Sequence, residues 1–245
     1  MAVTQRAAAG GNDITAGGQI TIPSTVETGD LLLVVVDINS VSYTIGDADQ
    51  HKVAGWDCLL DGKVIADGTV GGSQFASVYG RYAQPGDADT VVTFPVTPNG
   101  SKKALSLVSY YASTVGKRVN IVDSVLRGET SSTSSHATNG VTVAATPATL
   151  VSAIGKKGTT VSTITAPSGY TLFGVQNLTA GSSNNGTAWA DRAAPGTGAQ
   201  FATWTVNVAN SAATTFLLVL EEGDPPPLPQ PVFRVWTTEG WSPAP

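Results

Sequence analysis

One stretch of the chain occurs twice, and this repeat limits what the chain can fold into. Residues 85–108 align with residues 195–218 at a constant offset of 110, without a gap. Matched positions include Pro85 with Pro195, Gly86 with Gly196, Phe94 with Trp204, Val96 with Val206 and Leu107 with Leu217. The repeat predicts two related halves with the same order of strands and turns. Convergent turn sequences are the alternative, because Pro-Gly and Asn-Gly turns recur in unrelated β proteins.

The apolar residues within each copy follow the pattern of β-strands. Leu31–Val36 is a continuous run of Leu and Val after a Gly-Asp turn, which is typical of a strand covered on both faces. In residues 201–208, Ala202, Trp204 and Val206 alternate with other residues, which indicates a sheet with one buried face. Further predicted strands are Phe75–Ala83, Thr90–Val96, Ala104–Ala112, Asn120–Val125, Val141–Ala145, Leu150–Ile154, Thr187–Arg192 and Thr215–Glu221.

These strands predict an all-β chain. No segment of a dozen residues has helical spacing, and charged residues make up only 13% of the chain, against ~25% in a typical globular protein. We predict an N-terminal arm at residues 1–18 and a jelly-roll-like β-sandwich at residues 19–222, with halves at about 19–115 and 116–222. Pairing of the halves protects exposed sheet edges. Nothing between the halves resembles a linker, because residues 120–125 have the composition of a strand and only residues 128–140 there are expected to form a loop. Two tandem sandwiches are the alternative.

The composition changes after the second half. Residues 223–231 form a Pro-rich spacer, which we expect to be extended because proline has no amide hydrogen and restricts the residue before it. Residues 232–245 then form a short C-terminal hairpin, which we call the strap. A hairpin of this length is marginal alone in water and needs a partner surface. We therefore expect Phe233, Arg234, Val235, Trp236 and Trp241 to bind a partner.

Charge and cysteine content exclude several classes of protein. The net charge is −5 and the cations do not cluster, so we expect no binding to nucleic acid. Cys58 is the only cysteine, so an intrachain disulfide is impossible. The longest apolar run, Leu31–Val36, is far shorter than the ~20 residues that span a bilayer. The first residues also lack the apolar stretch of a signal peptide. We expect folding in a reducing cytoplasm without membrane insertion.

The sequence carries no motif of a catalytic or metal site. His51 and His136 lie far apart and have no metal-ligating neighbours at useful spacing. The Gly-Asp-Ala-Asp segments at 46–49 and 86–89 contain oxygen ligands that calcium prefers, but their spacing is more typical of Asx-rich turns. No G-x-S-x-G motif occurs. We therefore expect no catalytic residues, no cofactor and no metal, and predict that the chain is not an enzyme.

Three tryptophans lie in or beside predicted strands. Trp56, Trp189 and Trp204 are expected in the core, because aromatic side chains bury large areas and anchor sheets. The alternative is that one or two rings are exposed and serve as platforms for sugar rings, which would suit a carbohydrate-binding module.

Several of these motifs together resemble a known family. The order "GDLLLVVV … GWDCL … VYGRYAQPGDADTVVTF … LSLVSYY" resembles virion proteins of phages that infect actinobacteria, above all their minor tail proteins and related head-decorating proteins. The matching residues are Gly29-Asp30, Gly55-Trp56, Ala83, Gly86-Asp87 and the closing segment "FRVWTTEGWSPAP". The second half is less typical, because Tyr170 stands where the first half has Trp56.

The resemblance implies a non-enzymatic structural component of a bacteriophage virion. We expect a minor tail protein that is assembled in the bacterial cytoplasm, displayed on the particle and attached through a terminal segment. Its partners would be other virion proteins in a multicopy assembly or homo-oligomer. Capsid decoration or a head fibre is one alternative. A module that binds glycans of the host surface is another.

Overall fold

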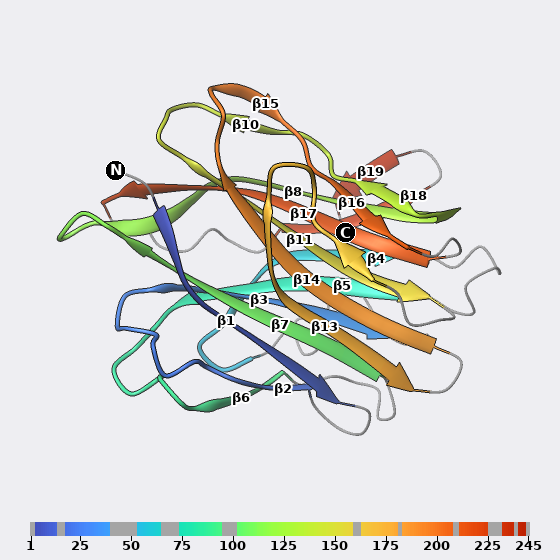
Figure 1. The fold of residues 1–245 in the computed structure, drawn as a ribbon, viewed down its shortest axis with the longest axis horizontal. Coiled ribbons are helices and arrows are strands. Elements are labelled where there is room, and N and C mark those ends of the chain that lie inside the picture. The colour runs from blue at the N-terminus through green and yellow to red at the C-terminus, as the bar shows by residue number, and fades with distance from the viewer. Residues whose placement is uncertain are drawn as a thin grey trace.

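The computed structural model describes residues 3–13, 18–39, 53–64, 74–94, 102–158, 163–180, 183–207, 211–224, 232–237 and 240–243. Within these ranges every regular element is a β-strand, so the prediction of an all-β fold is confirmed (Figure 1). The main strands form two sheets that pack face to face as a β-sandwich. The finer jelly-roll connection stays a prediction.

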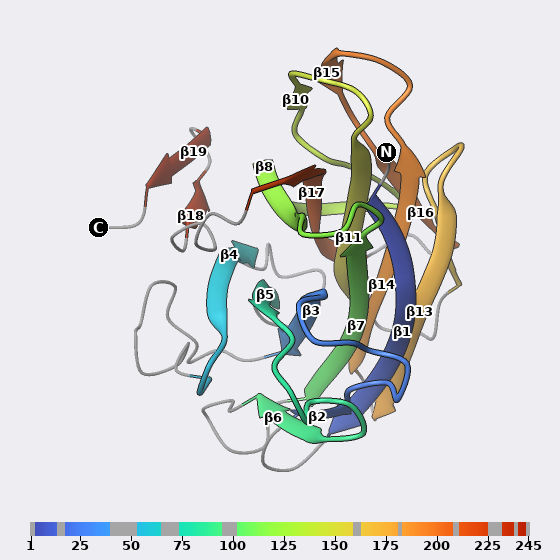
Figure 2. The ribbon, with the colours of Figure 1, turned by 90° about the vertical axis from the view of Figure 1, so that its left-hand side faces the viewer.

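The first half contributes one sheet, with the strand order β1-β7-β3-β5-β4. Its antiparallel strands are β1 (Val3–Asp13), β3 (Leu31–Asn39), β4 (Asp57–Val64), β5 (Gln74–Tyr82) and β7 (Lys102–Ala112). β2 (Gly18–Thr21) and β6 (Val91–Phe94) form a separate two-stranded ribbon. Figure 2 shows this ribbon at the bottom of the molecule, on the first-half side.

The second half repeats this arrangement. Its sheet has the order β8-β17-β11-β14-β13. The strands are β8 (Arg118–Thr133), β11 (Thr149–Gly158), β13 (Thr171–Ala180), β14 (Ser183–Ala193) and β17 (Ser211–Gly223). Smaller strands are β9 (Ser135–Ala137), β10 (Val141–Val143), β12 (Ile164–Thr165), β15 (Gly198–Gln200) and β16 (Thr203–Val206). Each strand pairing of the first-half sheet has its counterpart here, and the pair β9–β16 corresponds to β2–β6. The prediction of two related halves is confirmed.

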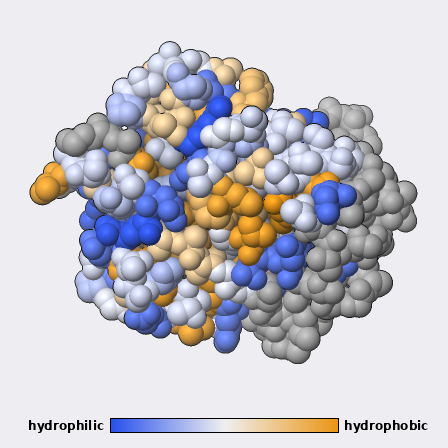
Figure 3. Space-filling view, in the orientation of Figure 1, coloured by the Kyte–Doolittle hydropathy of each residue, from blue (hydrophilic) through white to orange (hydrophobic). Residues whose placement is uncertain are grey.

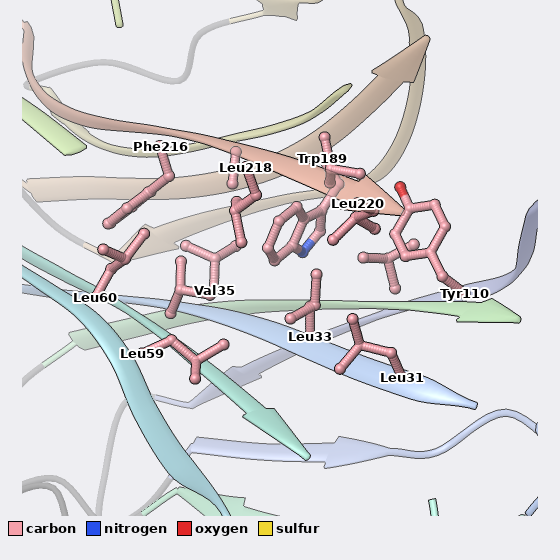
Figure 4. Packing of buried hydrophobic residues seen from close by; sticks show 14 of the residues in the cluster. Leu31, Leu33, Val35, Leu59, Leu60, Tyr110, Trp189, Phe216, Leu218 and Leu220 are labelled. Atoms are coloured by element: carbon pink, nitrogen blue, oxygen red, sulfur yellow. The ribbon is translucent and has the colours of Figure 1, made fainter. Parts of the chain in front are cut away.

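The two large sheets share one apolar core. Side chains from both sheets form this inter-sheet core, in which Trp189 faces Leu33 (Figure 4). Its fully buried members include Leu31, Leu33, Val35, Leu60, Val78, Val108 and Tyr110 from the first half and Leu126, Val151, Ala153, Trp189, Phe216, Leu218 and Leu220 from the second. Because the halves bury their apolar faces against each other, they form one body and are not two separate tandem sandwiches.

Each sheet has a second apolar core on its other face. In β3, Leu31, Leu33 and Val35 enter the inter-sheet core, while Leu32, Val34 and Val36 pack on the first-half ribbon beside Phe94. In β17 the same alternation places Leu217 and Val219 in the outer core of the second half. Full burial of one such side chain contributes ~1.5–3 kcal/mol. The run Leu31–Val36 is therefore a strand covered on both faces, as predicted.

One turn occurs in both halves with the same local structure. Gly55 and Gly169 have φ angles of +75° and +79°, a region that favours glycine because it has no Cβ. The next residue in each turn is aromatic, and an arginine from the neighbouring strand covers its ring. Arg81 lies 4.9 Å from the ring centre of Trp56, and Arg192 lies 4.7 Å from that of Tyr170. Tyr170 thus takes the place of Trp56 without changing the contact.

Three expectations about chain segments are wrong in part. The range 1–18, expected as an arm, contains β1, which pairs with β7 from Val3 to Asp13 and buries Val3 in the inter-sheet core. The expected loop at 128–140 contains the end of β8 and all of β9. Ser and Thr dominate this segment; Thr is common in strands, and pairing with β17 and β16 supplies the hydrogen bonds. The spacer also starts later than expected, because Gly223 still belongs to β17.

Candidate functional site

The strap lies at the edge of the first-half sheet. β18 (Val232–Thr237) pairs in parallel with β4, with Val232 opposite Leu60 and Phe233 opposite Asp61. β19 (Gly240–Pro243) returns antiparallel to β18. Figure 2 shows β18 and β19 beyond β4, at the far left of the view. The strap therefore adds to a sheet edge through its main chain.

The predicted partner-binding residues all belong to this strap. β18 contains Phe233, Arg234, Val235 and Trp236, and β19 contains Trp241 opposite Trp236. Their side-chain contacts lie outside the described part of the structure, so their role in binding stays a prediction. The edge that receives the strap is firmly anchored, because Leu60 of β4 is buried in the inter-sheet core.

A cluster of buried polar side chains lies between the two sheets, at the end where the apolar inter-sheet core stops. Asp37 of β3 accepts hydrogen bonds from Gln74 of β5 and from Asn185 of β14, the latter at 2.8 Å between Nδ2 and Oδ2. Gln74 also donates to the carbonyl oxygen of Gly155 at 3.1 Å and accepts from Thr214 at 2.9 Å. These bonds connect strands of both halves. We call Asp37, Gln74, Lys157, Asn185 and Thr214 the polar cluster; all five are fully or almost fully buried.

Burial strongly perturbs two ionisable groups at this end of the sandwich. Removal from water raises the pKa of Asp37 from 3.8 to about 8, because the hydrogen bonds from Gln74 and Asn185 and the charges of Lys156 and Lys157 offset only part of the desolvation. Burial lowers the pKa of Lys156 from 10.5 to about 8, and the charge of Asp37 opposes this shift. The site can therefore hold a neutral carboxyl group at neutral pH.

The three tryptophans and one of the two histidines considered from the sequence are buried in the described part of the structure. Trp56, Trp189 and Trp204 are all buried, as predicted, and the indole nitrogens of Trp189 and Trp204 donate to Ser106 O and Ser152 Oγ. None of these three rings is available as a sugar platform. His136 is buried, and its Nδ1 lies 3.1 Å from Glu129. His51 lies outside the described residues.

The Gly-Asp-Ala-Asp segment at 86–89 forms a turn. Asp87 accepts from the backbone N–H of Gln84 at 2.6 Å and pairs with Arg81 at 2.8 Å. These bonds fit the predicted Asx-rich turn. The segment at 46–49 lies outside the described residues. Across the residues that are described, no three His, Cys, Asp or Glu side chains group as metal ligands.

Two surface features lie away from the strap. A hollow of about 490 Å³ near the β7–β8 connection is lined by both cations and anions, and in it Arg6 pairs with Asp30 at 2.7 Å and covers the ring of Tyr111. Figure 3 shows an apolar patch near the middle of the face where β13 runs. Leu172 and Val175 of β13 are more than one-third exposed.

Sequence reasoning missed the polar cluster. Its members are spread from residue 37 to residue 214 and come from five different strands, so no local motif joins them. One signal was present: Asp37 ends a run of six apolar residues in a strand expected to be covered on both faces. An acid that continues such a strand is buried and needs partners.

Comparisons with known proteins give no relative. No family model, no curated protein and no solved structure matches the chain. Among the described residues there is no helix long and apolar enough to cross a lipid bilayer.

Proposed function

We propose that this chain is a non-enzymatic structural component of a bacteriophage virion. In this proposal it is a minor tail protein, displayed on the particle and held there by its strap. The resemblance of its strand and turn motifs to actinobacteriophage virion proteins supports the class. The position of the strap at the edge of β4 supports the means of attachment.

The strap carries the proposal because strand addition at a sheet edge is a general way to join two proteins. Main-chain hydrogen bonds supply affinity, and alternate side chains supply specificity. Residues 224–231 contain five prolines, a composition for which we expect a stiff, extended spacer. Residues 225–231 lie outside the described part of the structure. A strap on a stiff spacer reaches either its own β4 edge or an equivalent edge of a neighbour in the particle.

The buried groups of the sandwich suit a durable structural role. Asp37, whose pKa burial raises to about 8, lies between the sheets and not in an open cleft. Apolar cores on both faces of each sheet and a low content of charged residues suit a protein that must withstand exposure outside the cell.

The proposal is tested with particles of the parent phage. A chain that lacks residues 225–245 keeps all of β17 and should fold, but it should be absent from purified particles. Immunogold labelling of the full-length chain should mark the tail. A second variant that keeps 224–231 and lacks 232–245 separates the strap from its spacer.

Four other results would contradict part or all of the proposed function. Incorporation of the truncated chain at the wild-type copy number would contradict attachment through the strap. Labels on the capsid would replace the tail assignment by the head-decoration alternative. Absence of the full-length chain from purified particles would overturn the virion role, and a glycan-array signal lost on truncation of one aromatic ring would favour the carbohydrate-binding alternative.

A further inference from the structure

Lys157 and Asn185 of the polar cluster lie directly opposite each other in adjacent strands. The β11–β14 ladder pairs these two residues, and directly opposite residues have Cβ atoms ~4.5–5.5 Å apart. Alternation along β11 places Lys157 on the same face as Val151 and Ala153, which belong to the inter-sheet core. Asn185 shares its face with Trp189 in the same way. Both side chains are fully buried.

Asp37 brings a carboxyl group from the facing sheet to this pair. Its Oδ2 accepts from the Asn185 amide nitrogen at 2.8 Å, so it contacts the amide group itself. Gln74 holds the other carboxyl oxygen, and Gln74 is fixed in turn by Thr214 and the Gly155 carbonyl. Burial raises the pKa of Asp37 to about 8, which makes the group able to hold a proton at neutral pH. An amide and a proton-carrying acid thus meet in a buried site, and the lysine directly opposite the amide in the β11–β14 ladder shares their face.

We propose that Lys157 and Asn185 react with each other to form an isopeptide bond, with Asp37 as the catalytic acid and base. The inference does not depend on the proposed virion function. It assigns a self-modification site to the interior of the sandwich.

The reaction balances without any other reagent. In the starting state the proton lies on Asp37, and Nζ of Lys157 is neutral and attacks Cγ of Asn185. Asp37, which contacts Nδ2 of Asn185, gives its proton to that nitrogen as the Cγ–Nδ2 bond breaks, and Nδ2 departs as ammonia. The proton that Nζ loses as the Nζ–Cγ bond forms returns to Asp37, so Asp37 is protonated again at the end.

The placement of the two side chains and their removal from water both favour the reaction. Two groups held side by side react as one molecule, which removes much of the entropic cost of their meeting. A buried lysine is more easily deprotonated than an exposed one, because burial disfavours its charged form. The adjacent Lys156 lies on the opposite face of β11 by the same alternation, so it serves as a matched control.

The test is the intact mass of the denatured, full-length chain at isotopic resolution. We expect a mass lower than that of the sequence by one ammonia. Trypsin should cleave after Lys156 but not after Lys157, leaving one peptide of residues 157–192 with an internal link between Lys157 and Asn185. Lys157→Arg and Asp37→Asn should restore the full mass, and Lys156→Arg should leave the loss in place.

One competing product has the same mass and must be separated. Asn185 precedes Gly186, so a cyclic imide with the chain's own backbone would also lose one ammonia. Such an imide opens in mild base, and trypsin still cleaves after Lys157. An isopeptide bond is stable in mild base and blocks cleavage after Lys157. Three results would overturn the proposal: a full mass in the wild-type chain, a loss of mass that mild base reverses, or a link through Lys156. All three are measured without the Asp37 variant, so they decide the matter even if that variant fails to fold.

Discussion

Asp37 is the residue with the most unusual environment in the described part of the chain. It ends an apolar run in β3, yet hydrogen bonds from Gln74 and Asn185 hold it between the sheets. The partners of Asp37 were not predictable from the sequence. Which polar residues meet across two sheets depends on strand order and register, and the chain separates Asp37 from Asn185 by more than a hundred residues.

Asp37 should make stability depend on pH. Its pKa is about 8 in the folded chain and 3.8 in the unfolded reference, so between pH 4 and pH 8 the folded state retains a proton that the unfolded state releases. The free energy of unfolding therefore falls as pH rises through this window. Urea titrations at pH 5 and pH 8 should show this fall in the wild-type chain and a smaller one in Asp37→Asn.

Lys156 changes the stability of the fold in a different pH window, so it does not affect the comparison of pH 5 with pH 8. The pKa of Lys156 is about 8 in the folded chain, below its ordinary value of 10.5. Its contribution to the free energy of unfolding therefore falls as pH falls from 10.5 to about 8, and it is constant at lower pH. An equal slope in Asp37→Asn and the wild-type chain between pH 5 and pH 8 would show that Asp37 is ionised in the folded state.

Trp189 should be among the most sensitive residues of the inter-sheet core. It is fully buried, and its indole nitrogen donates to Ser106 O at 2.9 Å. Trp189→Phe removes volume and leaves that carbonyl without its donor, so we expect a loss of ~2–3 kcal/mol in the free energy of unfolding. Val115→Ala, at a fully exposed position, should change it by less than ~0.5 kcal/mol. Equal effects of the two substitutions in chemical denaturation would contradict this.

At the scale of elements, strands with strong apolar patterns were predictable and weakly patterned strands were not. β3 and β17 follow from their runs of Leu and Val, and the alternation of Trp204 and Val206 marked β16. β1 was missed because five of its eleven residues are Ala or Gly, and the end of β8 was missed because Ser and Thr there resemble a loop. Both strands gain their order from pairing with a neighbour, β7 and β17 respectively, which a local pattern does not reveal.

The strap should protect one particular sheet edge. β18 pairs with β4 near Leu60 and Asp61, while β13 forms an edge of the other sheet. Removal of residues 225–245 should therefore speed amide hydrogen exchange in β4 and leave β13 unchanged. Hydrogen-exchange mass spectrometry of the two purified chains measures this. Unchanged exchange in β4 would show that the strap does not occupy this edge in solution.

At the scale of the whole molecule, the shared core should make the two halves unfold together. Leu33 and Val35 of one half pack against Trp189 and Leu218 of the other, so neither sheet keeps its apolar face covered alone. Scanning calorimetry should give one transition whose calorimetric and van't Hoff enthalpies agree. Two separate transitions would mean that each half is stable without its partner.

The connection between the halves has a practical consequence. Residues 113–117 join β7 to β8, and Val115 there is fully exposed. A chain cut at this connection would yield two fragments that bind each other through their largest apolar surfaces. The protein therefore offers a natural split point, where two separately made pieces, each carrying its own fused cargo, are brought together by complementation.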